Sequence, residues 1–259
     1  MVNLSWALAE AYAKVNQNVR VEISGGGAGI GVAALINGTC DIADSARKLL
    51  PEEIEKAQAK LGRDLQEFPI GYDALIVCVH RDNPLEQISI AQLAQIYREG
   101  GRIDKWSDLG VKMPKNRDNI VRVSRQNNSG SYHFFREILI GKQADFKLGS
   151  RAMNSSKEAV ELVTQVPAAI GYAAIAWVQP GVKILRISDN DPDKAVSPSR
   201  ESVCNGSYPF ARAMFMYTRA EPPVHVADYI RWVRSLPGQK IVEESGYIPL
   251  PEKQLAKLD

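Results

Sequence analysis

Hydrophobic positions along the chain follow two alternating periods. Between residues 4 and 15 the apolar side chains recur at every third or fourth position, which predicts an amphipathic helix. Residues 19–23 alternate valine or isoleucine with charged residues and predict a strand with one buried face. The nearly continuous apolar run at 72–80 predicts a buried strand.

The same alternation continues to the C-terminus. It predicts further helices at residues 32–37, from 51 onward, at 89–98, 132–140 and 226–235, and strands at 41–43, 121–124 and 213–217. Residues 170–177 and 183–187 supply shorter strand or helical pieces. Helices that alternate with strands imply an α/β fold with largely parallel sheets.

Composition and charge narrow the class of protein. The 259 residues are enough for about two domains, and 45% hydrophobic with 24% charged residues is an ordinary globular composition. The net charge of +2 gives no electrostatic footprint for nucleic acid or for an anionic membrane surface. No apolar run approaches the roughly 20 residues that span a bilayer. We therefore expect a globular protein with no nucleic-acid partner.

The motifs of common enzymes are missing from the sequence. The three cysteines are widely spaced without a Cys-x-x-Cys pair, and the three histidines are isolated, so we expect no metal site. The glycine-rich stretch 24–31 fails the dinucleotide fingerprint at Ile30 or Val32, and it lacks the lysine of a Walker A loop. A Gly-x-Ser-x-Gly elbow is also absent. We expect neither catalytic residues nor a cofactor.

Two junctions between a predicted strand and a predicted helix carry the binding chemistry. The first turn of a helix leaves N–H groups unpaired and carries partial positive charge, so such a junction favours an anion. An ordinary tight turn at the glycines and an ordinary N-cap at Ser129 are the structural alternatives. The candidate ligand-binding residues are Gly27, Ala28 and Gly29 at the first junction, and Arg125, Ser129, Gly130 and Ser131 at the second.

Both junctions resemble signatures of a known family. The stretch Ser-Gly-Gly-Gly-Ala-Gly-Ile-Gly at 24–31, continued by Asp-Ile-Ala-Asp-Ser-Ala-Arg at 41–47, is similar to the first-domain signature of phosphate-binding proteins of ABC transporters. The arginine followed by Ser-Gly-Ser at 125–131 resembles their second-domain signature. The resemblance extends in order through residues 90–109, Ala-Ile-Gly-Tyr at 169–172 and Ser-Tyr-Pro-Phe-Ala-Arg at 207–212. It covers nearly the whole chain.

The resemblance implies a two-lobed periplasmic-binding-protein-like α/β fold, with a ligand cleft between the lobes. Lobe I would comprise residues 1–77 plus 213–259 and lobe II residues 78–212, joined by crossovers near 73–80 and 212–217. The implied function is capture of inorganic phosphate and its delivery to the permease subunits of an ABC transporter, without covalent chemistry. The protein would act as a monomer in the periplasm or at the cell surface.

The sequence departs from the family pattern in its first lobe. Ala28, Ile30 and Ala46 stand where the family often has hydroxyl or acidic side chains, which leaves backbone N–H groups, Ser45 and Arg47 to serve the anion. The family also begins with a strand whose loop helps to hold the ligand, and that strand would lie immediately before Met1. We therefore expect either that Met1 lies inside a longer precursor or that the gene start was placed too late.

Selectivity follows from protons. Hydrogen phosphate carries an O–H group that needs an acceptor, whereas sulfate has none, so a buried carboxylate favours phosphate. Asp44 and Asp73 are the candidates; a turn cap and an arginine partner, respectively, are the alternatives. Other functions stay open: a signalling protein of the same fold without a transport role, a binder of sulfate or another oxyanion, or an enzyme acting on a phosphoester in the same cleft.

Overall fold

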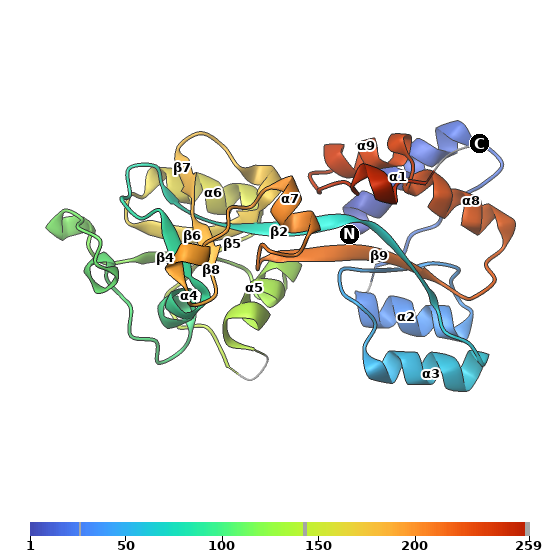
Figure 1. The fold of residues 1–259 in the computed structure, drawn as a ribbon, viewed down its shortest axis with the longest axis horizontal. Helices are drawn as coiled ribbons and strands as arrows, with labels where there is room; N and C mark the ends of the chain where they lie inside the picture. The colour runs from blue at the N-terminus through green and yellow to red at the C-terminus, as the bar shows by residue number, and fades with distance from the viewer. Residues whose placement is uncertain (26, 142–143, 257–259) are drawn as a thin grey trace. The chain divides into compact units, whose positions relative to one another are not determined.

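The computed structural model describes residues 1–25, 27–141 and 144–256 (Figure 1). The chain divides into two compact units. Unit 1 comprises Met1–Asp73 and Arg212–Asp259, and unit 2 comprises Ala74–Ala211. The chain leaves unit 1 within strand β2 (Gln66–His80) and returns at the start of β9 (Ala211–Thr218).

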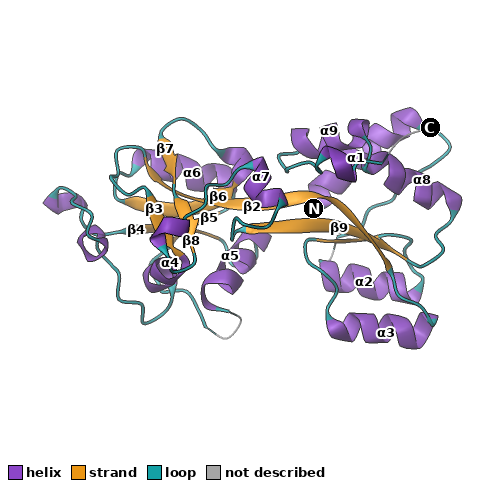
Figure 2. Cartoon of the chain, viewed as in Figure 1, coloured by secondary structure: helices purple, strands orange, loops and turns teal. Residues whose placement is uncertain are grey.

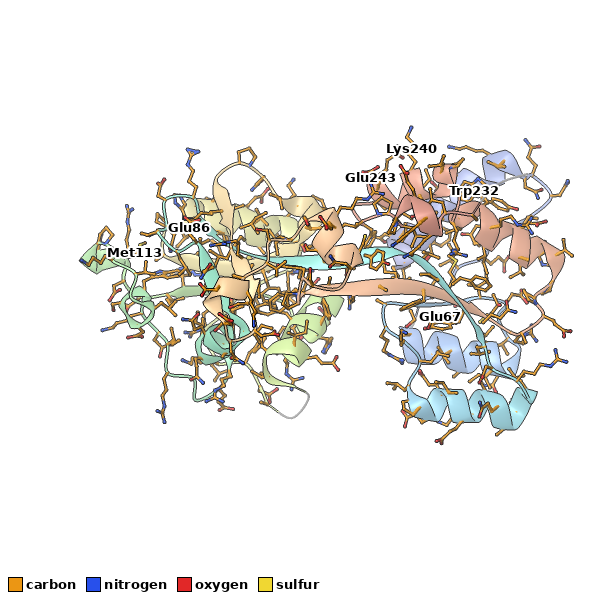
Figure 3. The ribbon with its side chains drawn as sticks, viewed as in Figure 1. Glu67, Glu86, Met113, Trp232, Lys240 and Glu243 are labelled. Atoms are coloured by element: carbon orange, nitrogen blue, oxygen red, sulfur yellow. The ribbon has the colours of Figure 1, made fainter. Side chains whose placement is uncertain are left out.

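Unit 1 is a small sheet with helices on both faces (Figure 2). Strand β1 (Ala43–Ser45) pairs antiparallel with β9, and β9 neighbours β2. The Tyr217 hydroxyl donates a 2.7 Å hydrogen bond to Glu67, labelled in Figure 3, which ties β9 to β2. The helices of unit 1 are α1 (Val2–Val15), α2 (Ala28–Asn37), α3 (Pro51–Leu61), α8 (Val224–Val233) and α9 (Leu236–Glu244), with a 3-10 turn at Glu252–Gln254.

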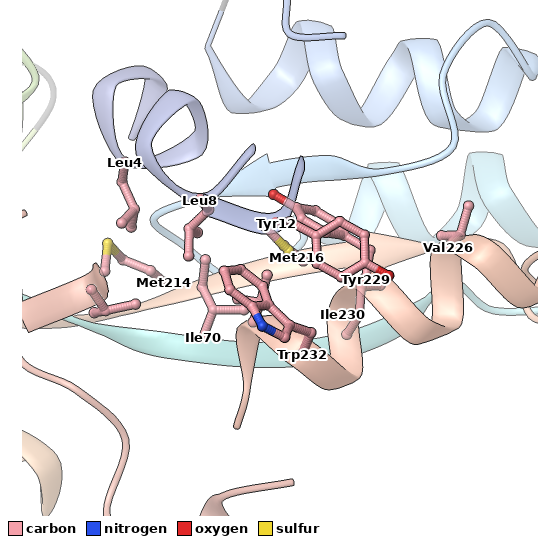
Figure 4. Packing of buried hydrophobic residues seen from close by; sticks show 12 residues of the cluster. Leu4, Leu8, Tyr12, Ile70, Met214, Met216, Val226, Tyr229, Ile230 and Trp232 are labelled. Carbon is pink, nitrogen blue, oxygen red and sulfur yellow. The ribbon is translucent and has the colours of Figure 1, made fainter. Parts of the chain in front are cut away.

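Strand β9 shows why unit 1 has two cores. Successive side chains of a strand point to opposite faces of the sheet. Met214 and Met216 pack with α1, α8 and α9, in a cluster that includes Leu8 and Trp232 (Figure 4). Phe215 and Tyr217 instead pack with α2 and α3. A single eight-residue strand therefore anchors both helical layers.

Unit 2 is built on the strands β2-β6-β4-β5 of the seven-stranded sheet, with β7 also paired to β2. A separate parallel pair joins β3 to β8. The further strands are β3 (Gln87–Ser89), β4 (Val121–Arg125), β5 (Arg151–Met153), β6 (Ala169–Ala174), β7 (Val182–Ile184) and β8 (Arg186–Ser188). The helices are α4 (Ile90–Tyr97), α5 (Gly130–Ile140), α6 (Ser156–Gln165) and α7 (Arg200–Cys204), with 3-10 turns at Trp106–Leu109, Lys115–Arg117, Ile175–Trp177 and Pro192–Lys194.

Strand β6 separates the two faces of unit 2. Ala169 and Ala173 pack on α6, and at Gly171 between them a Cβ would lie only 3.0 Å from the Val163 side chain, so the close approach of α6 requires glycine there. Tyr172 points to the other face, where its ring stacks on Phe135 of α5. The described structure is thus the α/β fold that the alternating periods predict.

Three local predictions need correction. Residues 19–23 do not form a strand, because no neighbouring strand in the described chain pairs with them; Val19 and Val21 still pack on the core. The short strand predicted at 41–43 is β1 at Ala43–Ser45 instead. The sheets are not largely parallel as predicted: β2 pairs antiparallel with β6, whereas β4 pairs in parallel with β5 and β6, and β3 with β8.

Within the described ranges, no helix combines the length and the apolar content needed to cross a bilayer.

Candidate functional site

The amino end of α2 lies inside the glycine-rich stretch. Gly27 is the N-cap residue with φ +86°, a left-handed conformation that favours glycine, and no side chain caps the helix. The first helical bond runs from Gly31 N–H to the Gly27 carbonyl, so the N–H groups of Ala28, Gly29 and Ile30 precede the ladder. The first turn holds no acidic residue. These N–H groups are the donors that an anion would use.

The helix begins four residues earlier than the sequence predicts. The predicted start at residue 32 rests on the apolar run that begins there, and glycine is a poor helix former. In the structure, Val32, Leu35 and Ile36 are buried against the sheet of unit 1. Their packing stabilises the helix enough for Ala28–Gly31 to join it.

Arg47 lies beside Gly29, paired with a carboxylate. Its guanidinium makes two hydrogen bonds of 2.8 Å to Glu53, one to each carboxylate oxygen, and donates at 2.9 Å to the Lys48 carbonyl. A Cβ at Gly29 would lie 4.0 Å from both Arg47 Nη2 and Glu53 Oε1. The hydrogen bond from Arg47 lowers the pKa of Glu53, so the pair is ionised. The charge of Arg47 is therefore locally balanced.

Asp44 and Ser45 follow one another in β1 and play different parts. The Ser45 hydroxyl accepts from Arg47 N–H and donates to the Arg47 carbonyl, so Ser45 makes the turn bond that was the alternative for Asp44. The Ser5 hydroxyl donates to Asp44 Oδ2. Asp44 Oδ1 is buried without a partner among the described residues. Burial raises the pKa of Asp44, although the bond from Ser5 opposes the shift.

Asp73 is the partner of an arginine, as its structural alternative predicts. Arg212 donates to Asp73 Oδ2 from Nε at 3.1 Å and from Nη2 at 2.7 Å. The carboxylate is buried, with 9% of the residue exposed. Its role toward a ligand stays a prediction.

Arg125 at the end of β4 is held by neutral acceptors. Its guanidinium donates to the Met153 carbonyl at 3.3 Å, the Asn154 carbonyl at 2.9 Å and the Ser156 hydroxyl at 2.9 Å. No carboxylate of the described chain forms an ion pair with it, and burial lowers the pKa of the half-buried group. The side chain is oriented while its positive charge stays uncompensated by direct contact.

The second junction leads into α5, which begins at Gly130, two residues before the predicted start at 132. Ser129 is the N-cap residue and its hydroxyl accepts from Tyr132 N–H at 3.1 Å. Gly130 and Ser131 are the first two helical residues, so their N–H groups precede the ladder. No acidic residue occupies the first turn. The capping alternative for Ser129 is therefore realised together with two unengaged N–H groups.

Each unit brings its own candidates together. In unit 1, Gly29 neighbours Arg47, and Asp44 and Ser45 adjoin it along β1. In unit 2, a single loop carries Arg125 and the start of α5. Sequence reasoning missed Glu53, whose only signal was its place in the first turn of a predicted helix. It also missed the acceptors of Arg125, because two of them are backbone carbonyls that no residue type reveals.

Other chemistry lies apart from these candidates. A cavity of about 280 Å³ in unit 2 is lined by the turn after β8 and by the loop before β9, and none of the predicted site residues lines it. The described ranges contain no group of three or more histidine, cysteine, aspartate or glutamate residues placed to hold a metal ion.

Known proteins are similar to this chain over most of its length. The sequence model of the PBP superfamily domain matches residues 2–235. The phosphate-binding protein PstS of Pseudomonas aeruginosa is 29% identical, over 99% of this chain and 82% of its own length. Protein SphX of Synechococcus elongatus is 31% identical, over 96% and 75%. A solved structure from Clostridium perfringens, assigned as a phosphate ABC transporter substrate-binding protein with bound phosphate, is 27% identical with a TM-score of 0.70, over 96% of each chain.

Proposed function

The chain belongs to the PBP superfamily, and from this premise we propose that it captures inorganic phosphate for an ABC transporter. Similarity over nearly the full chain to PstS and to the phosphate-bound structure supports this ligand. The protein binds without covalent chemistry and passes the ion to the permease subunits. It acts as a monomer outside the cytoplasm, in the periplasm or at the cell surface.

Arg125 carries the proposal. A half-buried guanidinium normally gains a carboxylate partner, because burial of an unpaired charge costs free energy. Among the described residues, the hydrogen-bond partners of the Arg125 side chain are all neutral, and the charge of Glu158 acts on it without forming an ion pair. It precedes a helix start that offers further N–H donors. This combination of fixed charge and unengaged donors fits an oxyanion.

Unit 1 offers anion donors and an acceptor of its own. The uncapped start of α2 supplies backbone N–H groups in place of the hydroxyl donors that Ala28 and Ile30 lack. Asp44 Oδ1 is buried without a hydrogen-bond partner in the described part of the chain, and it accepts the hydrogen of HPO₄²⁻ or H₂PO₄⁻. Sulfate has no hydrogen to donate and would be repelled by the carboxylate. Phosphate is therefore favoured over sulfate.

Calorimetry with an anion panel tests the binding. We expect one phosphate per chain and much weaker heat with sulfate, molybdate or small phosphoesters. A ligand at 100 times its Kd should stabilise the fold by about 2.7 kcal/mol, which a thermal melt detects. Equal response to sulfate would favour the other-oxyanion alternative, and the absence of any response to phosphate would reject the proposal.

Delivery to a permease needs a second measurement. Phosphate-loaded protein should stimulate ATP hydrolysis by the cognate permease in proteoliposomes, whereas protein without phosphate should not. Tight phosphate binding without any stimulation would assign the protein to signalling and not to transport.

A further inference from the structure

The Ala-Ile-Gly-Tyr stretch at 169–172 contains a buried tyrosine beside the anion loop. Tyr172 is fully buried, and its ring stacks on Phe135 of α5 with centroids 3.8 Å apart and planes at 19°. Its hydroxyl accepts from Arg125 N–H at 3.2 Å and lies 2.9 Å from the Ser124 hydroxyl. Tyr172 thus contacts the last residues of β4 through its oxygen and α5 through its ring.

The hydroxyls of Tyr172 and Ser124 form a closed circuit of three hydrogen bonds with the backbone of Arg125. The Ser124 hydroxyl lies 3.2 Å from the Arg125 carbonyl, to which it can only donate. Its hydrogen is then used, so the Tyr172 hydroxyl donates to Ser124 and accepts from Arg125 N–H. Each N–H or O–H hydrogen is donated once, and the hydrogen bonds in such a chain strengthen one another. Burial raises the pKa of Tyr172 to about 12, which keeps its hydrogen in place at neutral pH.

These hydrogen bonds lie where the pairing of β4 with β6 has ended. Strand β4 pairs with β6 at Val121 and Arg122 only. At Arg125 the backbone of β6 no longer provides an acceptor, and the Tyr172 side chain takes that place. The other edge of β4 still pairs Arg125 with Met153 of β5.

We propose that Tyr172 is a positioning residue for anion binding, which fixes both ends of the loop from Arg125 to Gly130. Its hydroxyl holds the backbone from which the Arg125 side chain extends, and its ring holds the helix whose first N–H groups face the loop. This inference rests on the proposed function, because it assigns a residue that prepares the same phosphate-binding loop.

A matched pair of variants tests the inference. Tyr172→Phe keeps the ring and removes the circuit, and we expect the Kd for phosphate to rise roughly tenfold. The control is Tyr97→Phe. Tyr97 is equally buried, packs edge-on against Phe135, and donates to the carbonyls of Val123 and Ile170 in the same two strands, but it does not contact Arg125. Its removal should lower the melting temperature while leaving the Kd within about twofold.

A second readout needs no ligand. The ¹⁵N resonance of Arg125 Nε should broaden in ligand-free Tyr172→Phe and stay sharp in Tyr97→Phe. Ser124→Ala breaks the circuit without touching the ring and should reproduce the loss of affinity, which keeps the test informative if Tyr172→Phe fails to fold. Equal Kd values in the tyrosine variants, with unchanged Arg125 resonances, would overturn the inference. If the wild-type protein does not bind phosphate, the proposed function is rejected. The Arg125 resonances would still show whether Tyr172 positions the Arg125 side chain.

Discussion

The starts of α2 and α5 are the two candidate anion-binding segments, and they offer different chemical groups to an anion. At the start of α5, unit 2 presents a capped helix and Arg125, a cation held by neutral atoms. At the start of α2, unit 1 presents an uncapped helix beside Arg47, whose charge Glu53 balances. Unit 1 also holds Asp44, a carboxylate with one unpartnered oxygen. The segment in unit 2 therefore presents a cation with no carboxylate in direct contact among the described residues, whereas the segment in unit 1 presents neutral donors and an acceptor.

This difference separates affinity from selectivity. A cation without a carboxylate partner attracts every oxyanion, so it raises affinity without distinguishing phosphate from sulfate. A buried acceptor distinguishes them through the hydrogen that only phosphate carries. Variants in the two units should consequently change different quantities.

The largest effect is expected in unit 2. Arg125→Ala removes a charge that no described carboxylate contacts directly, and it should weaken phosphate binding by about 2–5 kcal/mol, measured by calorimetry. Sulfate binding, where detectable, should weaken by the same factor. Arg186→Ala is the matched control, since Arg186 is exposed in the same unit, carries the same charge and donates from its side chain to Gln87 Oε1 at 2.7 Å. Unchanged affinity in Arg125→Ala would show that Arg125 does not bind the anion.

A smaller and different effect is expected in unit 1. Asp44→Asn keeps an oxygen that accepts from Ser5 and places an NH₂ group where the unpartnered oxygen stands. Phosphate then loses an acceptor while sulfate gains a donor. The ratio of phosphate to sulfate affinity should fall roughly 10- to 100-fold, since a hydrogen bond to a charged group contributes about 1.5–3 kcal/mol. Competition calorimetry measures this ratio; a constant ratio would show that Asp44 does not select the ligand.

The smallest effect tests the balance of charge at α2. Glu53→Gln leaves Arg47 without its carboxylate partner, so anion affinity should rise by roughly two- to fivefold, within the range of a screened charge. The free energy of unfolding should fall by about 1 kcal/mol at neutral pH. Denaturant titrations and calorimetry measure the two changes, which should have opposite signs.

The pH dependence of this variant follows from the lowered pKa of Glu53. Ionised Glu53 stabilises the fold above the pKa of the unfolded chain, and that contribution is lost as the pH falls through the lower pKa of the folded state. The stability difference between wild type and Glu53→Gln should therefore shrink on acidification. A difference that grows at low pH would contradict the ion pair with Arg47.

The sequence predicts the elements that hydrophobic packing determines. The start of α3 at Pro51 and the continuous strand inside β2 agree with the pattern, because burial and the proline each favour one local structure. Residues 19–23 show the limit of the same reasoning. Alternation tells which side chains face the core, but a strand also requires a partner for its backbone, and the pattern does not specify one.

The candidate site was predictable as residue types and not as contacts. The two helix starts could be found from glycine, serine and arginine next to strand ends. That Arg47 is paired and Arg125 is not depends on tertiary approach: Glu53 folds back six positions later, while Arg125 meets carbonyls of a segment 28 and 29 positions away. The charged residues near each arginine in the sequence do not show which of the two is paired.

Unit 1 consists of two chain segments that are separated in the sequence by all of unit 2, and this has a consequence for biosynthesis. Leu4, Leu8 and Tyr12 emerge early from the ribosome, yet their core partners Met214 and Trp232 come after all of unit 2. At about 5–20 residues per second, the nascent α1 waits on the order of ten seconds with its apolar face uncovered. Unit 2, which is continuous in sequence, can complete its sheet during that time. The part of unit 1 that is made before unit 2 therefore becomes a folded domain only after unit 2, and until then it is the part that a chaperone would hold.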